Sequence, residues 1–352
     1  MADGESGRPH RGRVTVVVVN YNGGRRLEEA LESHRPAGGD GPDLVVVDNA
    51  STDGSREAIR AFAARTVEVR AVLNERNVGY SAAVNEVARS VDAEYLAVLN
   101  MDVVVEPGWL APLVDHLDAH PEVAAVNPLI TTDAGDRVAA AGQAIHVSGL
   151  GFNRSLGLPV GEMPRRPFRI SGIQGGAFVV RRRAMLEIGG MDAAGFLYHE
   201  DVHLSWLLRL AGHELACVPA SRVRHDYFLS MYPEKFYLLE RNRLALLVTY
   251  LRPTTLLLLS PVLLLTEAMA WTYSLLRGAG FLRAKAASYR WVAASWRRLR
   301  RRREEARRWR RIGDLRLLER LHWRYCWDQF ATLGRERGAS TRQPVGGLPT
   351  RL

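Results

Sequence analysis

The stretch VTVVVVNYNGG at residues 14–24 decides the fold class, because it joins a buried strand to a turn and a helix. Its first six residues are almost all β-branched, which is typical of a short strand covered on both faces. The turn at residues 22–24 leads into a helical pattern that places Leu27 and Leu31 on one face. A fully covered strand followed by a helix predicts an α/β protein.

The same alternation continues through the first hundred residues. We predict further strands at residues 44–47, 67–73 and 95–99, and a helix at residues 82–88. Strands that alternate with helices of this length predict a doubly wound, mostly parallel sheet, which binds ligands beyond the carboxyl ends of its strands. Polar side chains follow these ends in the sequence: Asn20, Tyr21 and Asn22, then Asp48 and Asn49, then Asn100 and Asp102.

The composition excludes several classes of protein. With 352 residues, of which 47% are hydrophobic, the chain can bury a sizeable core, so wholesale disorder is excluded. Two cysteines, Cys217 and Cys326, are too few for a disulfide framework or a cysteine-rich zinc site, and they favour a reducing compartment. No apolar run precedes Val14, so we expect no secretory signal peptide and a cytoplasmic catalytic site.

The positive charge is concentrated in one segment. Residues 277–311 hold 14 Lys or Arg and two Glu, so this segment has a net charge of +12. Because the net charge of the whole chain is +10, the remaining residues sum to about −2. This basic tract directly follows the apolar residues 254–276, which favours anionic lipid over nucleic acid as its partner. Trp296 and Trp309 suit either base stacking or a membrane interface. We expect an anionic membrane surface and no nucleic-acid partner.

Residues 254–276 are long enough to cross a bilayer, but their surroundings argue against a simple span. As one helix they would measure roughly 34 Å, against about 30 Å of hydrocarbon. Arginines flank both ends, and Pro261 and Glu267 lie within the segment. We therefore expect a re-entrant or in-plane helix with both ends cytoplasmic. A buried helix, a dimer face and a single span are the alternatives.

A few acidic and histidine positions suggest chemistry, although each has an ordinary structural explanation. Asp48 could accept the imide N–H of a uracil or thymine base, or simply belong to a βα loop. Asp102 is a suitable oxygen ligand for Mg²⁺ or Mn²⁺, or a helix cap. Glu200 and Asp201 could supply a general base, or merely favour a helix N-terminus. His225 could be a ligand, although such a histidine is more often a surface or core residue.

The order of these stretches carries more information than any one of them. The relevant segments are VVVVNYNGGRRLEEAL, VVDNASTDGS, RNVGYSAAVNEV, VLNMDV, GGAFVVRRRAMLEIGGMD and FLYHEDVHLSWLLRLAGHELACVPASRVRHDY. Together they resemble the inverting family-2 glycosyltransferases of GT-A fold, in particular the rhamnosyltransferase and galactofuranosyltransferase branch. The resemblance covers roughly residues 14–228, and the rest of the chain matches only in its apolar and then basic character.

The resemblance implies a binding site for a nucleoside-diphosphate sugar donor. Tyr21 and Asp48 would contact the nucleoside, while Gly175 and Gly176 would bring backbone close to the sugar. The full set of implied donor-binding residues is Tyr21, Asn22, Asp48, Asn77, Gly79, Asn100, Asp102, Gly175 and Gly176.

The resemblance also implies the catalytic and metal-binding groups. Asp201 matches the catalytic base, with Glu200 beside it near the acceptor. Asp102 matches the surviving metal-binding acid of the family's DxD motif, and Asn100 stands where many members have the first Asp. His225 matches the histidine that ligates the metal or approaches the diphosphate. The implied cofactor is Mg²⁺ or Mn²⁺, which would assist a single displacement that inverts the anomeric configuration.

Two departures from the family pattern leave the acceptor open. Many relatives have a second Asp and an Arg where this chain has His203 and Leu207. We expect transfer from dTDP-rhamnose or a UDP-hexose to a hydroxyl of a cell-envelope or polyprenyl-linked glycan. The alternative is a catalytically inactive sugar-nucleotide-binding or scaffold protein at the membrane.

We expect the chain to be organised in four parts. They are a flexible N-terminus at residues 1–13, a GT-A domain at residues 14–237, a helical apolar and Arg-rich membrane-association region at residues 238–332, and a disordered tail at residues 333–352. The protein would work at the cytoplasmic face of the cell membrane, attached peripherally or monotopically.

Overall fold

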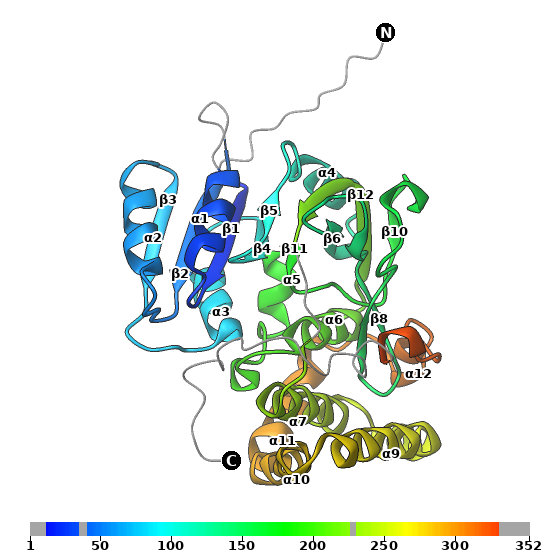
Figure 1. The fold of residues 1–352 in the computed structure, drawn as a ribbon. Helices are drawn as coiled ribbons and strands as arrows, with labels where there is room; N and C mark the ends of the chain where they lie inside the picture. Colours follow the sequence, from blue (N-terminus) through cyan, green and yellow to red (C-terminus); the bar gives the residue numbers. More distant parts are fainter. Residues whose placement is uncertain (1–11, 35–40, 226–229, 331–352) are drawn as a thin grey trace.

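A computed structural model describes residues 12–34, 41–225 and 230–330 of the chain. The expected flexible N-terminus, apart from its last two residues, and the expected disordered tail lie outside the described residues. The described chain forms a mixed sheet with helices on both faces, joined to a layer of C-terminal helices (Figure 1).

The first half of the chain forms the parallel part of the sheet, as predicted. Its four strands pair in the order β4-β1-β2-β3. They are β1 (Val14–Asn20), β2 (Asp43–Asp48), β3 (Val69–Leu73) and β4 (Tyr95–Asn100), with helices α1 (Gly24–Ser33), α2 (Ser55–Ala64) and α3 (Tyr80–Ser90) between them. The third strand begins two residues later than predicted, because Val67 is 91% exposed and lies in the preceding turn.

Strand β1 is covered on both faces, which explains its run of valines. Val16 and Val18 pack with α1, α2 and α4 (Ala111–Ala119) on one side of the sheet. Val17 and Val19 pack on the other side with α3, α5 (Arg182–Glu187) and α6 (Glu200–Leu210). Alternate side chains of one strand therefore contribute to two hydrophobic cores.

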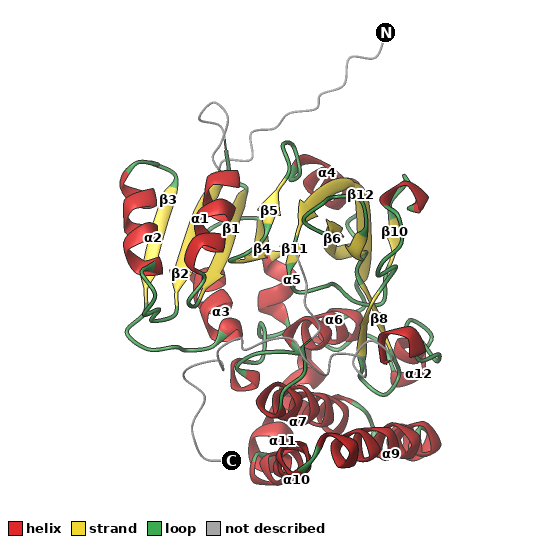
Figure 2. Ribbon diagram, viewed as in Figure 1, coloured by secondary structure: helices red, strands yellow, loops and turns green. Residues whose placement is uncertain are grey.

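The second half of the sheet is mixed (Figure 2). Strand β11 (Ala177–Arg181) runs antiparallel to both β4 and β6 (Val123–Thr131), while β12 (Glu214–Arg224) is parallel to β6. Short strands complete the described sheets: β5 (Val104–Val105), β7 (Val138–Ala140), β8 (Gln143–Ile145), β9 (Gly151–Asn153) and β10 (Phe168–Arg169). Strands of two or three residues are too short to leave a periodic pattern, which explains the weak sequence signal there.

The C-terminal helices lie against the α6 side of the sheet domain (Figure 1). They are α7 (Pro233–Tyr250), α8 (Pro253–Leu258), α9 (Ser260–Arg277), α10 (Ala279–Ala294), α11 (Trp296–Trp309) and α12 (Asp314–Leu318). The boundary expected between residues 237 and 238 falls inside α7.

The apolar segment at residues 254–276 lies in two successive helices, α8 and α9, rather than in the single helix whose length was compared with the bilayer. Helix α8 ends at Leu258, and Pro261, which has no N–H to donate, is the second residue of α9. Within the described ranges, no helix combines the length and the apolar character needed to cross a bilayer.

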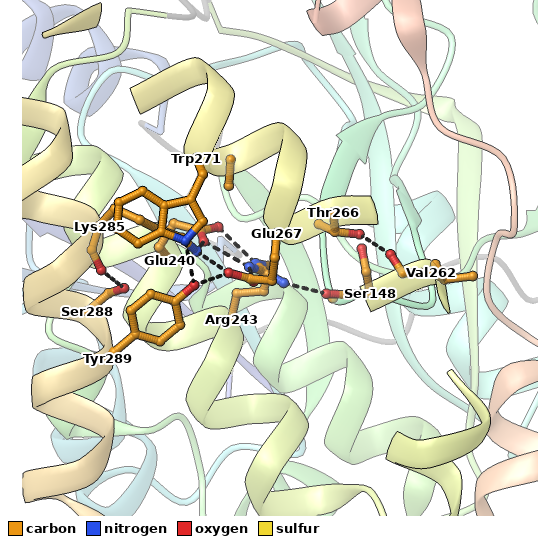
Figure 3. Close-up of polar contacts among 12 residues, drawn as sticks. Ser148, Glu240, Arg243, Val262, Thr266, Glu267, Trp271, Lys285, Ser288 and Tyr289 are labelled. Carbon is orange, nitrogen blue, oxygen red and sulfur yellow. Dashed lines mark hydrogen bonds and ion pairs between the residues drawn. The ribbon is translucent and has the colours of Figure 1, made fainter. Parts of the chain in front are cut away.

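A buried ionic cluster holds α9 against α7 and α10 (Figure 3). Arg243 on α7 donates to Glu240 at 2.8 Å and to Glu267 on α9 at 2.5 Å. Lys285 on α10 lies 2.7 Å from Glu267 and also contacts Glu240. Arg243 and Lys285 are 1% and 0% exposed. The charged groups of three helices therefore meet inside the layer.

The members of this cluster stabilise one another's charged forms. Burial alone would raise the pKa of Glu240, but Arg243 and Lys285 outweigh it and lower that pKa to about 2. Although burial also opposes the charge of Glu267, Arg243 and Lys285 lower its pKa. Burial opposes the charge of Lys285, yet Glu240 raises its pKa. All four groups are therefore charged at neutral pH.

Removing one cation should destabilise the helical layer strongly. Lys285→Met keeps the length of the side chain but leaves the buried Glu240 and the partly buried Glu267 with one guanidinium, so we expect a loss of about 3–5 kcal/mol in the free energy of unfolding. Urea denaturation measures this loss, with Arg283→Met, an exposed position on the same helix, as the control. Equal stability of the two variants would contradict the assignment.

Candidate active site

The loops after β1 and β2 are joined by a buried polar network. Asn20 donates from Nδ2 to Asp48 Oδ1 at 2.8 Å and to Ser51 Oγ at 3.0 Å. The hydroxyl of Ser51 donates to the same Asp48 oxygen at 2.5 Å, and Arg56 lies 3.3 Å from the other. Asp48 is fully buried. In this arrangement Asp48 holds the two loops together, and its contact with a nucleobase stays a prediction.

Tyr21 and Asn22 lie at the edge of this network. Both are partly exposed, and Asn22 has a positive φ of 53°. The side-chain oxygen of Asn22 accepts the backbone N–H of Thr52 at 2.8 Å. The turn that presents Tyr21 is therefore fixed to the loop that follows β2.

Asn77 and Gly79 connect this edge of the sheet to the loop before α6. Asn77 accepts the N–H of Gly79 at 2.9 Å, and Gly79 has a φ of 85°. A Cβ on Gly79 would lie 2.8 Å from the carbonyl oxygen of Phe196, which accepts the N–H of Tyr80. Glycine is thus required here both by its backbone conformation and by the close approach of the loop.

Asp102 and His225 meet at the carboxyl end of β4. His225 Nε2 lies 3.2 Å from Asp102 Oδ1, and Arg26 lies 3.9 Å from the other carboxylate oxygen. Burial opposes the charge of Asp102, but the hydrogen bond and the charge of His225 lower its pKa. Asn100, two residues earlier, donates its N–H to the carbonyl of Gly176 at 2.9 Å.

Gly175 and Gly176 lie between the acidic start of α6 and this Asp–His pair. The N–H of Gly175 donates to Asp201 Oδ2 at 2.9 Å, and a Cβ on Gly175 would lie 3.1 Å from that oxygen. A Cβ on Gly176 would lie 2.9 Å from Nδ1 of His225. Two successive backbone units therefore contact Asp201 on one side and His225 on the other, without space for a side chain.

Asp201 is held by three donors. Besides Gly175, Gln143 donates from Nε2 to Oδ2 at 2.8 Å, and the N–H of Val202 donates to Oδ1 at 2.7 Å. Burial raises the pKa of Asp201, while these hydrogen bonds act in the opposite direction. Gln143 was not among the predicted site residues, because it lies in the short-strand region and reaches Asp201 only through the fold.

Glu200 differs from its neighbour in having one unsatisfied carboxylate oxygen, since its buried Oε2 has no hydrogen-bond partner among the described residues. Burial, followed by the charge of Asp201, raises the pKa of Glu200 to about 8, so it is protonated at neutral pH. The residues before it are strained, since Phe196, Tyr198 and His199 all have φ between 64° and 71°.

The two positions that depart from the family pattern are inside the protein. Leu207 is fully buried, and the ring of His203 packs edge-on against Tyr250 at 5.5 Å. Burial lowers the pKa of His203 to about 3, so this ring is neutral. His203 and Glu200 both line a small cavity of about 20 Å³, with room for about one water. Both departures thus support the helix from within.

Asp102 and His225 are the residues that fit a divalent cation. Among the described residues there is no cluster of three or more His, Cys, Asp or Glu that could hold a metal. A two-residue set suits Mg²⁺ or Mn²⁺, because such ions commonly bind through one or two protein ligands and complete their coordination with phosphate oxygens and water.

Comparison with known proteins points to one family. The model of the family described as glycosyl transferase family 2 matches residues 15–189. An N-acetylglucosaminyl-diphospho-decaprenol L-rhamnosyltransferase of Mycobacterium tuberculosis is 31% identical over 235 residues, which cover 60% of this chain and 75% of the relative. A pre-mycofactocin glycosyltransferase of the same species is 30% identical over 228 residues, covering 63% of this chain and 44% of the relative.

Solved structures share the fold. The mannosyltransferase PcManGT from Pyrobaculum calidifontis, solved with GDP-Man and Mn²⁺, matches 84% of this chain and 86% of its own, with a TM-score of 0.52 and 21% identity. A structure of GalNAc-T7 with UDP, GalNAc and Mn²⁺ matches 68% of this chain and 48% of its own, with a TM-score of 0.54 and 21% identity. Both support the GT-A architecture.

Replacing Glu200 should alter stability in a pH-dependent way. Its pKa is raised in the folded state, so its contribution to stability is complete below the unfolded pKa near 4.5 and is lost as pH rises through about 8. Glu200→Gln should therefore be more stable than the wild type at pH 8 and equal to it near pH 4.5. Urea denaturation across this range tests the difference, with the exposed Glu29→Gln as the control. A gain independent of pH would contradict the assignment.

Proposed function

The chain belongs to glycosyl transferase family 2, and on that premise we propose that it is an inverting enzyme that transfers a sugar from a nucleoside diphosphate to a hydroxyl group. The observation that carries this proposal is the position of Gly175 and Gly176 between Asp201 and the Asp102–His225 pair. A donor sugar beside these glycines would have a base on one side and diphosphate-binding groups on the other. That arrangement favours one in-line displacement.

We propose that Asp201 removes the proton of the acceptor hydroxyl while the oxygen of that hydroxyl attacks the anomeric carbon. The bond from that carbon to the diphosphate breaks in the same step, which inverts the configuration. Asp201 must be ionised for this role, and the donors from Gly175 and Gln143 favour the charged carboxylate. Glu200, protonated below about pH 8, adds no second negative charge.

Asp102 and His225 would hold Mg²⁺ or Mn²⁺, which neutralises charge on the departing diphosphate. The geometry supports this assignment, because the Asp102 carboxylate lies 3.2 Å from Nε2 of His225, so an oxygen and a nitrogen ligand lie side by side. The remaining predicted residues would bind the donor: Tyr21, Asn22, Asp48, Asn77 and Gly79 around the nucleoside, and Asn100, Gly175 and Gly176 nearer the sugar.

A dTDP-rhamnose or UDP-hexose donor and a lipid-linked or cell-envelope glycan acceptor are the substrates we propose. The similarity to an L-rhamnosyltransferase named for a diphospho-decaprenol acceptor supports this choice. Such an acceptor would place the enzyme at the cytoplasmic face of the membrane. Incubation with a panel of UDP-, dTDP- and GDP-sugars, followed by assay of the released nucleotide, identifies the donor. The inactive-scaffold alternative predicts no turnover with any of them.

Asp201→Asn should bind the donor normally but transfer little sugar. Because general-base catalysis typically contributes about 10²–10⁴-fold, we expect turnover to fall by that factor. Donor affinity measured by calorimetry should change little, and the exposed Asp115→Asn serves as the control. Loss of donor affinity with intact turnover at saturation would mean that the base is another residue.

The metal proposal predicts that turnover stops in excess chelator and returns with added Mg²⁺ or Mn²⁺. Asp102→Ala should lower turnover by orders of magnitude, and His225→Ala should raise the metal concentration needed for half-maximal activity. Calorimetric titration of Mn²⁺ in the presence of UDP gives a readout independent of turnover. Unchanged titrations in both variants would remove this pair from the metal site.

A further inference from the structure

Helices α8 and α9 have an unusual distribution of side chains. Their buried residues are polar or small: Thr255, Thr266 and Ser274. Their exposed residues are largely leucines, which lie 50–77% exposed: Leu257, Leu258, Leu264, Leu265, Leu275 and Leu276. We call these six side chains the leucine ridge. Within α9, Leu275 and Leu276 follow Leu264 and Leu265 by eleven residues, which keeps these four on one side of the helix. This is the reverse of the pattern expected for a helix whose outer face meets water.

Polar contacts on the inner face fix this orientation. Glu267 points into the buried ionic cluster, where Arg243 donates to it at 2.5 Å (Figure 3). One residue earlier, Thr266 shares a hydrogen bond of 2.8 Å with the hydroxyl of Tyr325. Turning the leucine ridge inward would separate Glu267 from its two cations. Burying the ridge would therefore be energetically unfavourable, so the leucines stay on the outer face.

Two exposed indoles accompany the ridge. Trp323 and Trp327 are 54% and 59% exposed. They flank Tyr325, the residue that bonds to Thr266 on α9, so they lie close to the same helix. Tryptophan combines an apolar ring with one N–H donor and is enriched where hydrocarbon meets the polar headgroups of a bilayer.

A basic recess adjoins the start of the ridge. It measures about 500 Å³ and is lined by Arg252, Arg303, Arg307 and Arg310, together with Pro253, the first residue of α8. Arg310 pairs with Asp314. In the part of the chain that the structure describes, no carboxylate lies within 4 Å of the other three guanidinium groups. Elsewhere on α11, Arg297, Arg300 and Arg308 are also without such an acid. The recess thus offers positive charge for an external anion.

We propose that the leucine ridge inserts into the acyl region of an anionic bilayer, while the basic recess binds the phosphate of a lipid headgroup. Apolar side chains, interfacial indoles and guanidinium groups without a carboxylate partner among the described residues occur together in the C-terminal region, which is the combination that such a surface requires. Arg303 donates to the carbonyls of Val248 and Leu251, which leaves its positive charge unneutralised. A second copy of the chain fits less well, because face-to-face packing would bring two arginine clusters together. The proposal concerns binding alone and stands whether or not the proposed transfer reaction is correct.

Co-sedimentation with vesicles tests the proposal on the full chain. We expect binding to vesicles of phosphatidylcholine with phosphatidylglycerol, and much weaker binding to phosphatidylcholine alone. Leu264→Ser with Leu265→Ser should weaken binding about tenfold or more, since less apolar surface is buried. Arg303→Gln with Arg307→Gln should weaken binding and reduce its dependence on salt. Leu158→Ser, an exposed leucine on the sheet domain, is the matched control.

Circular dichroism and thermal denaturation check that each variant is folded. Vesicle binding that is unchanged in the ridge variant would overturn the proposal. So would a wild-type protein that ignores anionic vesicles but forms a dimer that the ridge variant abolishes, because the ridge would then be an interface between copies.

Discussion

The close approach of backbone to two side chains is the constraint on which the candidate site depends. At Gly175 a Cβ would lie 3.1 Å from the Asp201 carboxylate, and at Gly176 it would lie 2.9 Å from the His225 ring. A side chain at either position would crowd its neighbour. The N–H of Gly175 donates to Asp201 Oδ2 at 2.9 Å, and the N–H of Gly176 donates to the side-chain oxygen of Gln174 at 2.6 Å. Because β11 follows directly, the strand order that inserts β11 between β4 and β6 fixes this loop in place. The chemistry proposed for the site follows from this placement.

The helical layer depends on charged side chains that form ion pairs and hydrogen bonds inside the protein. Arginines from the basic tract and α7 reach back to the sheet domain, where Arg298 lies 3.0 Å from Asp192 and Arg243 donates to the carbonyl of Ser148. Asp192 begins the strained loop that leads to Glu200, so α11 contacts the segment that precedes α6. Part of the basic tract is therefore structural. If the membrane proposal is correct, the same helical layer would both support the site and bind a lipid surface.

The sequence predicts those features that depend on local pattern. The covered strand β1 and the parallel half of the sheet both follow from side-chain periodicity, since burial on one or both faces imposes it. The antiparallel insertion of β11 and the contact of Gln143 with Asp201 could not be predicted, because both join residues more than 50 positions apart. Asp48 shows a further limit. Its sequence motif indicates a functional loop, but only the fold reveals that the side chains of Asn20 and Ser51 both donate to Oδ1 of Asp48.

The stereochemistry of sugar release tests the central claim most directly. In this experiment water acts as the acceptor and the enzyme releases free sugar from an unlabelled nucleotide donor. Proton NMR, recorded before mutarotation, reveals the anomeric configuration of the released sugar. In the proposed site, a base at Asp201 lies on one side of Gly175 and Gly176, and the diphosphate-binding pair lies on the other. This arrangement therefore predicts a single displacement that releases the inverted anomer. Release of the anomer with the configuration of the donor would contradict this account, because retention requires a different arrangement of catalytic groups.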